Sequence, residues 1–159
     1  MKPLACLILL AAFADDTFTV TLAFETMHCD ECRTELEATV KKIPGFKSSS
    51  VAGESVTLVI EDKSPVPAFN RLPKDLRLKS ATLALSGTVS FADDKATLVA
   101  KGSGASLALA NPEPPEKIDR LSELKGKLGG KNRFRVTGEW VGGKTLVLGG
   151  FEAIDWEGP

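Results

Sequence analysis

The chain has 159 residues, of which 43% are hydrophobic and 26% are charged. This apolar content is too high for a disordered tail, and the sequence has neither the glycine period of collagen nor the heptads of a coiled coil. Its 20 basic and 21 acidic residues leave a formal net charge of −1, without the basic surplus typical of nucleic-acid binders. Three cysteines and one histidine exclude most catalytic and metal sites that need several such side chains. The composition predicts a globular protein of one or two domains, at ~100 to 200 residues per domain.

Residues 1–14 are predicted to be a secretory signal peptide. A short positive start is followed by an apolar run over residues 4–12 and by the small-x-small cleavage site Ala12-Phe13-Ala14. We expect cleavage after Ala14, because the apolar run is about half of the ~20 residues that span a bilayer. Cys6 resembles the last residue of a lipobox but comes too early in the run, so a lipid anchor there is the weaker interpretation. We therefore expect a periplasmic or secreted protein without a membrane span after signal cleavage.

The remaining chain is predicted to form two units, residues 15–80 and residues 81–159. Twelve of the 14 glycines lie between Gly87 and Gly158, which indicates a turn-rich β region in the second unit. In the first unit, apolar alternation and helical spacing predict the following elements: a strand over 17–25, a helix whose apolar face carries Cys32, Leu36, Val40 and Ile43, strands over 46–52 and 55–61, a short helix over 65–72, and a strand from about residue 76. This βαββαβ order predicts a ferredoxin-like domain.

Two cysteines remain after signal cleavage, Cys29 and Cys32, and they form a C-x-x-C motif between the first strand and the first helix. The run Met27-His28-Cys29-Asp30-Glu31-Cys32, with Ile43-Pro44-Gly45-Phe46 at the helix end, resembles the heavy-metal-associated (HMA) domain family over about residues 17–80. That family includes copper chaperones, periplasmic mercury-binding proteins and the amino-terminal modules of metal-pumping ATPases. The resemblance implies that Cys29 and Cys32 are the metal thiolates and that Met27 is a buried support of the loop.

The chemistry of the C-x-x-C motif also favours a soft metal. At a helix start the two sulfurs lie close to unpaired backbone N–H groups, which favour the thiolate form. Two thiolates suit Cu(I) best and bind Hg(II) in the same geometry, whereas Zn(II) or Cd(II) needs additional ligands. Asp30 and Glu31 oppose thiolate formation slightly by adding negative charge.

Two further residues are candidates for supporting roles. His28 is the only histidine and could supply a third donor, but a solvent-facing loop residue is the favoured interpretation. Lys74 precedes the last strand of the first unit and could balance the charge of a bound Cu(I) bis-thiolate, or it could be an ordinary exposed lysine.

In the second unit the predicted order is βββαββ, which resembles an OB-fold, a five-stranded barrel with a helix between its third and fourth strands. Its elements are a first strand with apolar alternation at Leu83, Leu85 and Val89, strands over 96–100 and 105–110, a helix over about 118–128, and strands over 133–140 and 144–154. The last two strands resemble the closing hairpin of bacterial periplasmic OB modules. The predicted fold class is thus α+β, a ferredoxin-like domain followed by a small OB-like β-barrel domain.

The second unit gives little support for nucleic-acid binding. Residues 81–159 contain 10 basic and 10 acidic residues, and Arg133-Phe134-Arg135 is their one basic and aromatic cluster. We expect Phe134 and Trp140 to be core or rim residues.

Three functions remain open. The favoured one is a metal-binding protein that sequesters a soft ion or exchanges it with a metal-donor or metal-acceptor protein, such as a membrane transporter. The alternatives are a thiol-disulfide redox protein and an adaptor whose cysteines form a structural disulfide. No enzyme site is predicted, because the sequence lacks G-x-S-x-G, P-loop and dinucleotide motifs.

Overall fold

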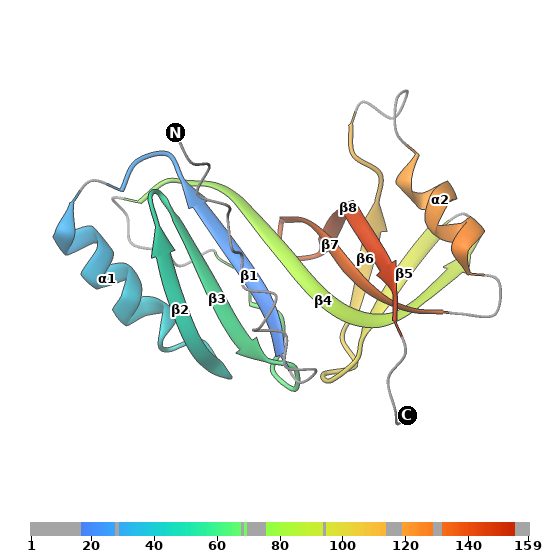
Figure 1. The fold of residues 1–159 in the computed structure, drawn as a ribbon, viewed down its shortest axis with the longest axis horizontal. Helices are drawn as coiled ribbons and strands as arrows, with labels where there is room; N and C mark the ends of the chain where they lie inside the picture. The colour runs from blue at the N-terminus through green and yellow to red at the C-terminus, as the bar shows by residue number, and fades with distance from the viewer. Residues whose placement is uncertain are drawn as a thin grey trace, which may run out of the picture.

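The computed structural model describes residues 17–27, 29–67, 69, 76–93, 95–113, 119–128 and 132–154. Eight strands and two helices follow one another along them (Figure 1). In chain order these are β1 (Thr17–Phe24), α1 (Asp30–Val40), β2 (Phe46–Ala52), β3 (Ser55–Glu61), β4 (Leu78–Ala92), β5 (Lys95–Ala100), β6 (Ser106–Ala110), α2 (Arg120–Lys127), β7 (Arg133–Val141) and β8 (Thr145–Ala153). Neither helix is long and apolar enough to cross a membrane.

β1, β2 and β3 form as their alternation predicts. On β1, Phe18, Val20, Leu22 and Phe24 are all buried, because alternate side chains of a strand point to one face of the sheet. The strands pair antiparallel in the order β2-β3-β1-β4. α1 adds Leu36 and Val40 to the buried core, and it ends at Val40, about one turn before the predicted Ile43.

β4 is the strand that joins the two halves of the molecule. It is 15 residues long, and its odd-numbered residues from Ala81 to Val89 are all buried. Its first part pairs with β1 and also with β7, so that Leu83 lies opposite Val20 on one side and Gly138 on the other. Its last part pairs with β5, where Val89 lies opposite Leu98. In Figure 1, β4 is the long strand that runs from the left group of strands into the right group.

β4 to β8 close into a five-stranded barrel. The strands follow one another as β4-β5-β6-β8-β7, and the β4–β7 pairing closes the ring. All of these pairs are antiparallel except β6 with β8. α2 lies between β6 and β7 in the chain and places Leu124 in the core.

The two halves also meet away from β4. Trp140 of β7 donates its indole N–H to the carbonyl of Pro67 at 3.1 Å, in the segment that follows β3. Gly102, in the turn between β5 and β6, lies against Asp62 at the end of β3, where a Cβ atom would overlap the Asp62 backbone. The buried side chains of both halves accordingly form one continuous cluster.

The predicted fold class, a ferredoxin-like domain followed by a separate OB-like domain, is wrong. The protein is a mostly-β single domain, a five-stranded mixed barrel extended by three further strands and two short helices. β4 passes through the boundary predicted at residue 80 without interruption. Of the helix predicted over residues 65–72, the described residues 65–67 and 69 are not helical, since Pro65 and Pro67 lack the N–H groups that helix hydrogen bonds need.

Candidate functional site

The C-x-x-C motif lies at the amino-terminal end of α1. Cys29 is the N-cap residue, with φ of −93° and ψ of 128°, and its carbonyl accepts the first helical hydrogen bond from the Arg33 N–H at 3.2 Å. Its side chain makes no capping hydrogen bond and is exposed. Cys32 lies in the first turn of the helix, half-buried against the core. Cys29 and Cys32 form no disulfide bond, so the structural disulfide of the adaptor hypothesis is not present in this structure.

The loop that carries Cys29 is fixed on the side of β1. Met27 is 1% exposed and belongs to the core, two residues before the exposed cysteine. The Phe24 N–H donates to the Glu54 carbonyl at 2.9 Å, and the Glu25 N–H donates to the Arg77 carbonyl at 3.0 Å. The end of β1 is therefore held between the β2–β3 turn and the residue that precedes β4.

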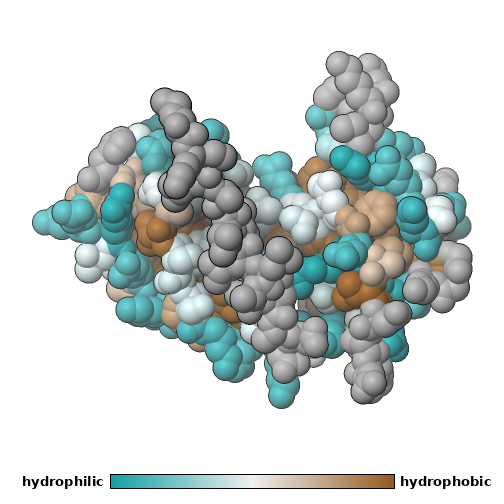
Figure 2. Space-filling model, in the orientation of Figure 1, coloured by the Kyte–Doolittle hydropathy of each residue, from teal (hydrophilic) through white to brown (hydrophobic). Residues whose placement is uncertain are grey.

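Acidic side chains lie near the site, and Arg33 and Arg77 are exposed there as well. Asp30 and Glu31 are exposed in the first turn of α1, and Glu25 and Glu54 are exposed at the end of β1 and in the adjoining turn. In Figure 2 the end of the molecule that carries α1 is mostly in the teal of hydrophilic residues.

The structure places only part of the predicted site. Cys29, Cys32 and Met27 lie together at the start of α1, whereas His28 and Lys74 lie outside the described residues, as do Cys6 and the predicted signal peptide. Among the described residues, no group of three or more histidine, cysteine, aspartate or glutamate side chains lies close enough to hold a metal ion. In the described part of the chain, Cys29 and Cys32 place two cysteine sulfurs at the start of α1.

The basic and aromatic cluster of β7 has no exposed ring. Phe134 is fully buried and packs edge-on against Phe151, with ring centroids 6.0 Å apart and planes at 80°. Trp140 is 7% exposed and hydrogen-bonded to Pro67. Both aromatics are core residues, as predicted, and neither offers a ring face to a nucleic-acid base.

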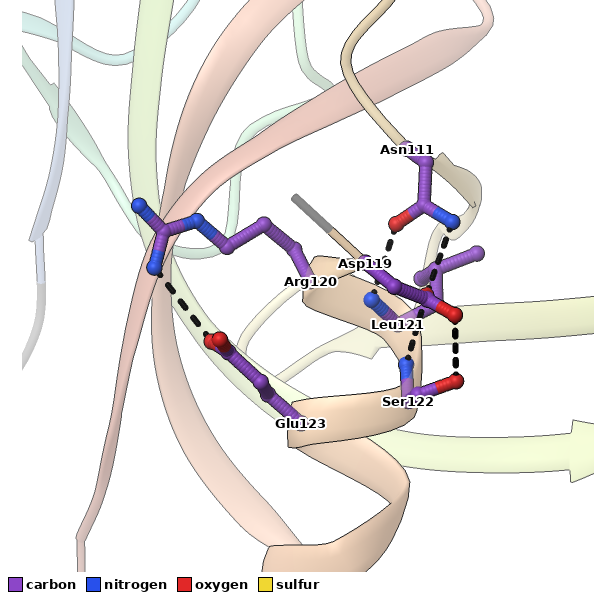
Figure 3. A network of polar contacts seen from close by, with 6 residues as sticks. All are labelled: Asn111, Asp119, Arg120, Leu121, Ser122 and Glu123. Carbon is purple, nitrogen blue, oxygen red and sulfur yellow. Dashed lines mark hydrogen bonds and ion pairs between the residues drawn. The ribbon is translucent and has the colours of Figure 1, made fainter. Parts of the chain in front are cut away.

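Sequence reasoning missed one polar network, which joins the end of β6 to α2 (Figure 3). Asp119 is the N-cap residue of α2 and accepts hydrogen bonds from the Ser122 N–H at 3.0 Å, the Ser122 hydroxyl at 2.6 Å and the Asn111 amide at 2.9 Å. The Asn111 side-chain carbonyl in turn accepts from the Leu121 N–H at 2.9 Å. The bonds from Ser122 and Asn111 lower the pKa of the Asp119 carboxyl. The network positions α2, and an aspartate three residues before a serine at a helix start was the signal for it.

Comparison with known proteins does not assign the chain to a family. No protein-family model, no curated protein and no solved structure matches it. The resemblance to heavy-metal-associated domains therefore stays a prediction that rests on residues 17–80 of this sequence.

Proposed function

We propose that this protein binds a soft metal ion, Cu(I) first, through the thiolates of Cys29 and Cys32, and sequesters it or exchanges it with a metal-donor or metal-acceptor protein. The metal is the cargo, and the proposed setting is the periplasm or the cell exterior. One observation carries the proposal. Two cysteine side chains that form no disulfide lie one helical turn apart at the start of α1, one exposed and the other half-buried.

The donor set explains why the proposal names Cu(I). Thiolates are soft ligands that select soft ions, and two of them satisfy an ion of low coordination number. Hg(II) fits the same pair, whereas Zn(II) takes four ligands in structural sites and Cd(II) likewise needs more than two donors. Among the described residues, Cys29 and Cys32 are the cysteines present, and no group of three or more histidine, cysteine, aspartate or glutamate side chains lies close enough to hold a metal ion.

Exposure explains why the proposal includes exchange. Cys29 is open to solvent at an N-cap, where its sulfur is not used to cap the helix. An incoming thiol from a partner protein can reach a metal at such a site and replace one ligand at a time. The adjoining loop is fixed by Met27 and by the hydrogen bonds of Glu25 and Phe24, so the site keeps its position as ligands exchange.

A competition titration tests the proposal. The reduced protein is titrated with Cu(I) against a chelator of known affinity, beside a Cys29→Ser/Cys32→Ser variant and the matched control Asp30→Asn/Glu31→Gln, which alters the same turn but keeps both thiols. We expect the wild type and the control to retain one Cu(I) per chain and the cysteine variant to retain none. Equal retention by the wild type and the cysteine variant would contradict the proposal. Reduction of insulin by the wild type and not by the cysteine variant would instead support the redox alternative.

A further inference from the structure

Among the described strands, β2 is the one that pairs with a single partner strand along its whole length. Every other strand has at least two partner strands, because β1, β3 and β4 lie inside the sheet and β5 to β8 close into the barrel. β2 pairs with β3 alone. An open edge presents a row of unpaired backbone N–H and C=O groups that can accept another strand.

The turn after β2 determines which backbone groups face outward. Gly53 and Glu54 form a two-residue turn, so Ala52 and Ser55 are the closing hydrogen-bonded pair. Hydrogen-bonded and non-hydrogen-bonded pairs then alternate along an antiparallel ladder. Ser50 and Ser48 therefore bond to β3, and the backbone groups of Ser49 and Val51 point to the outer side.

The outer side of β2 is accessible. Five of its seven residues are exposed, and Val51 is one of three exposed large hydrophobic residues among those described. Outside the sheet ladder, no backbone hydrogen bond between described residues involves residues 47–52. α1 packs through Leu36 and Val40 into the core and leaves these residues exposed.

The usual devices that block an open edge are mostly missing from β2. The strand contains no proline, and its single charged residue is Lys47. The Lys47 ammonium lies 2.8 Å from the Glu61 carboxylate of β3, so its charge is balanced within the hairpin. The register shift between Phe46 and Ser48 disturbs one end of the strand and leaves the stretch from Ser48 to Ala52 regular.

We infer that β2 is the contact through which two copies of this chain pair, strand against antiparallel strand. A two-fold axis through Ser49 places Ser49 opposite Ser49, Ser48 opposite Ser50, and Lys47 opposite Val51. In this register each lysine lies opposite a valine of the other copy, so the two β2 strands do not place like charges opposite each other. The net charge of −1 per chain adds little repulsion between copies.

This pairing leaves the cysteine site open. The Phe24 N–H donates to the Glu54 carbonyl in the β2–β3 turn, so the end of β1 that leads to Cys29 lies at the Ala52 end of β2. In an antiparallel pair the Ala52 end of one strand meets the Phe46 end of the other, so the two cysteine pairs lie at opposite ends of the contact. The association is therefore independent of metal and of the cysteines. Pairing through one strand edge buries less surface area than the ~1,200 Å² that stable protein interfaces bury. We therefore expect the dimers to be reversible.

Sedimentation velocity over a concentration series of the reduced, metal-free full chain tests the inference. We expect the wild-type mass to rise from 16.9 kDa toward twice that value. Val51→Lys places a lysine opposite Lys47 of the other copy and should stay monomeric, as should Ser49→Pro, which removes an outward N–H. The matched control is Val99→Lys on β5, because Val99 is equally exposed at 37% but lies between two partner strands.

Each outcome decides the inference. Retained association in Val99→Lys and in Cys29→Ser/Cys32→Ser, with loss in Val51→Lys, supports it. Protection of the Ser49 and Val51 amides from hydrogen exchange at high concentration does so as well. A wild type that stays monomeric at all concentrations overturns the inference, and the partner of β2 would then be an extended segment of another protein. Equal effects of the two lysine substitutions, or loss of association in the cysteine variant, also overturn it.

Discussion

Leu83→Ala tests whether the molecule is one cooperative unit. Leu83 is completely buried in β4, opposite Val20 of β1 and Gly138 of β7, so it belongs to the core on both sides of the predicted boundary. Truncating a fully buried leucine to alanine lowers the free energy of unfolding by about 2 to 5 kcal/mol, because the lost transfer free energy of the side chain and the cost of the cavity add together. A loss of about 3 kcal/mol corresponds to a melting temperature lower by about 6 to 12 °C in a domain of this size.

The assay compares the two halves directly. Native-state hydrogen exchange measures the opening free energy at Leu58 and Ile60 of β3 and at Leu146 and Leu148 of β8, all of which are buried. We expect Leu83→Ala to lower the opening free energy of both strands by the same amount. Val141→Ala is the control, since a side chain that is 46% exposed should change stability by about 0.5 kcal/mol or less. A decrease confined to one strand, or two separate unfolding transitions in the wild type, would refute the single-domain description.

Two further predictions concern turns and caps. Gly45→Ala should lower the free energy of unfolding in urea more than Gly53→Ala. Both glycines have a positive φ, +78° at Gly45 and +61° at Gly53, so both substitutions strain the backbone. A Cβ atom at Gly45 would also overlap the Ser64 hydroxyl, whereas nothing lies within 4 Å of a Cβ atom at Gly53. An equal decrease in the free energy of unfolding in the two variants would show that the Pro44-Gly45 turn is not packed against Ser64. Asp119 has a pKa below its ordinary value of about 3.9, so its contribution to stability should be complete above that pH and be lost as the pH falls through the lower folded value. The melting temperature of Asp119→Ala should therefore fall less than that of the wild type as the pH is lowered through this range, and parallel curves would contradict the role of the network in Figure 3.

Local patterns predicted the described strands and α1, because alternation and helical spacing record which side chains of one element are buried, whereas the helix expected over residues 65–72 was wrong in its described part. The alternation of Phe18, Val20 and Leu22 specifies a strand with one buried face, and the strand appears at the predicted position. The position of the C-x-x-C motif was predictable in the same way, because Cys29 and Cys32 lie at the start of a helix whose apolar spacing is visible in the sequence.

The pairing of the strands was not predictable from the same patterns. Alternation from Ala81 to Val89 is the same whether a strand begins a new domain or continues an earlier one, since it records only that one face is buried. That β4 pairs with β1, β7 and β5 in turn depends on contacts far apart in sequence. The hydrogen bond from Trp140 to Pro67 is likewise invisible to local reasoning, because 73 residues separate its partners.

X-ray absorption spectroscopy of the copper-loaded protein tests the central claim most directly, because it reports the ligands of the bound metal. Cys29 and Cys32 are the donors that the described chain offers, so the account predicts two sulfur ligands per Cu(I) and no nitrogen or oxygen ligand. The spectrum of a Cys29→Ser/Cys32→Ser sample should show no copper held by sulfur. A nitrogen ligand in the wild type that disappears in His28→Ala, or copper coordinated in the same way without the cysteines, would contradict a two-thiolate site.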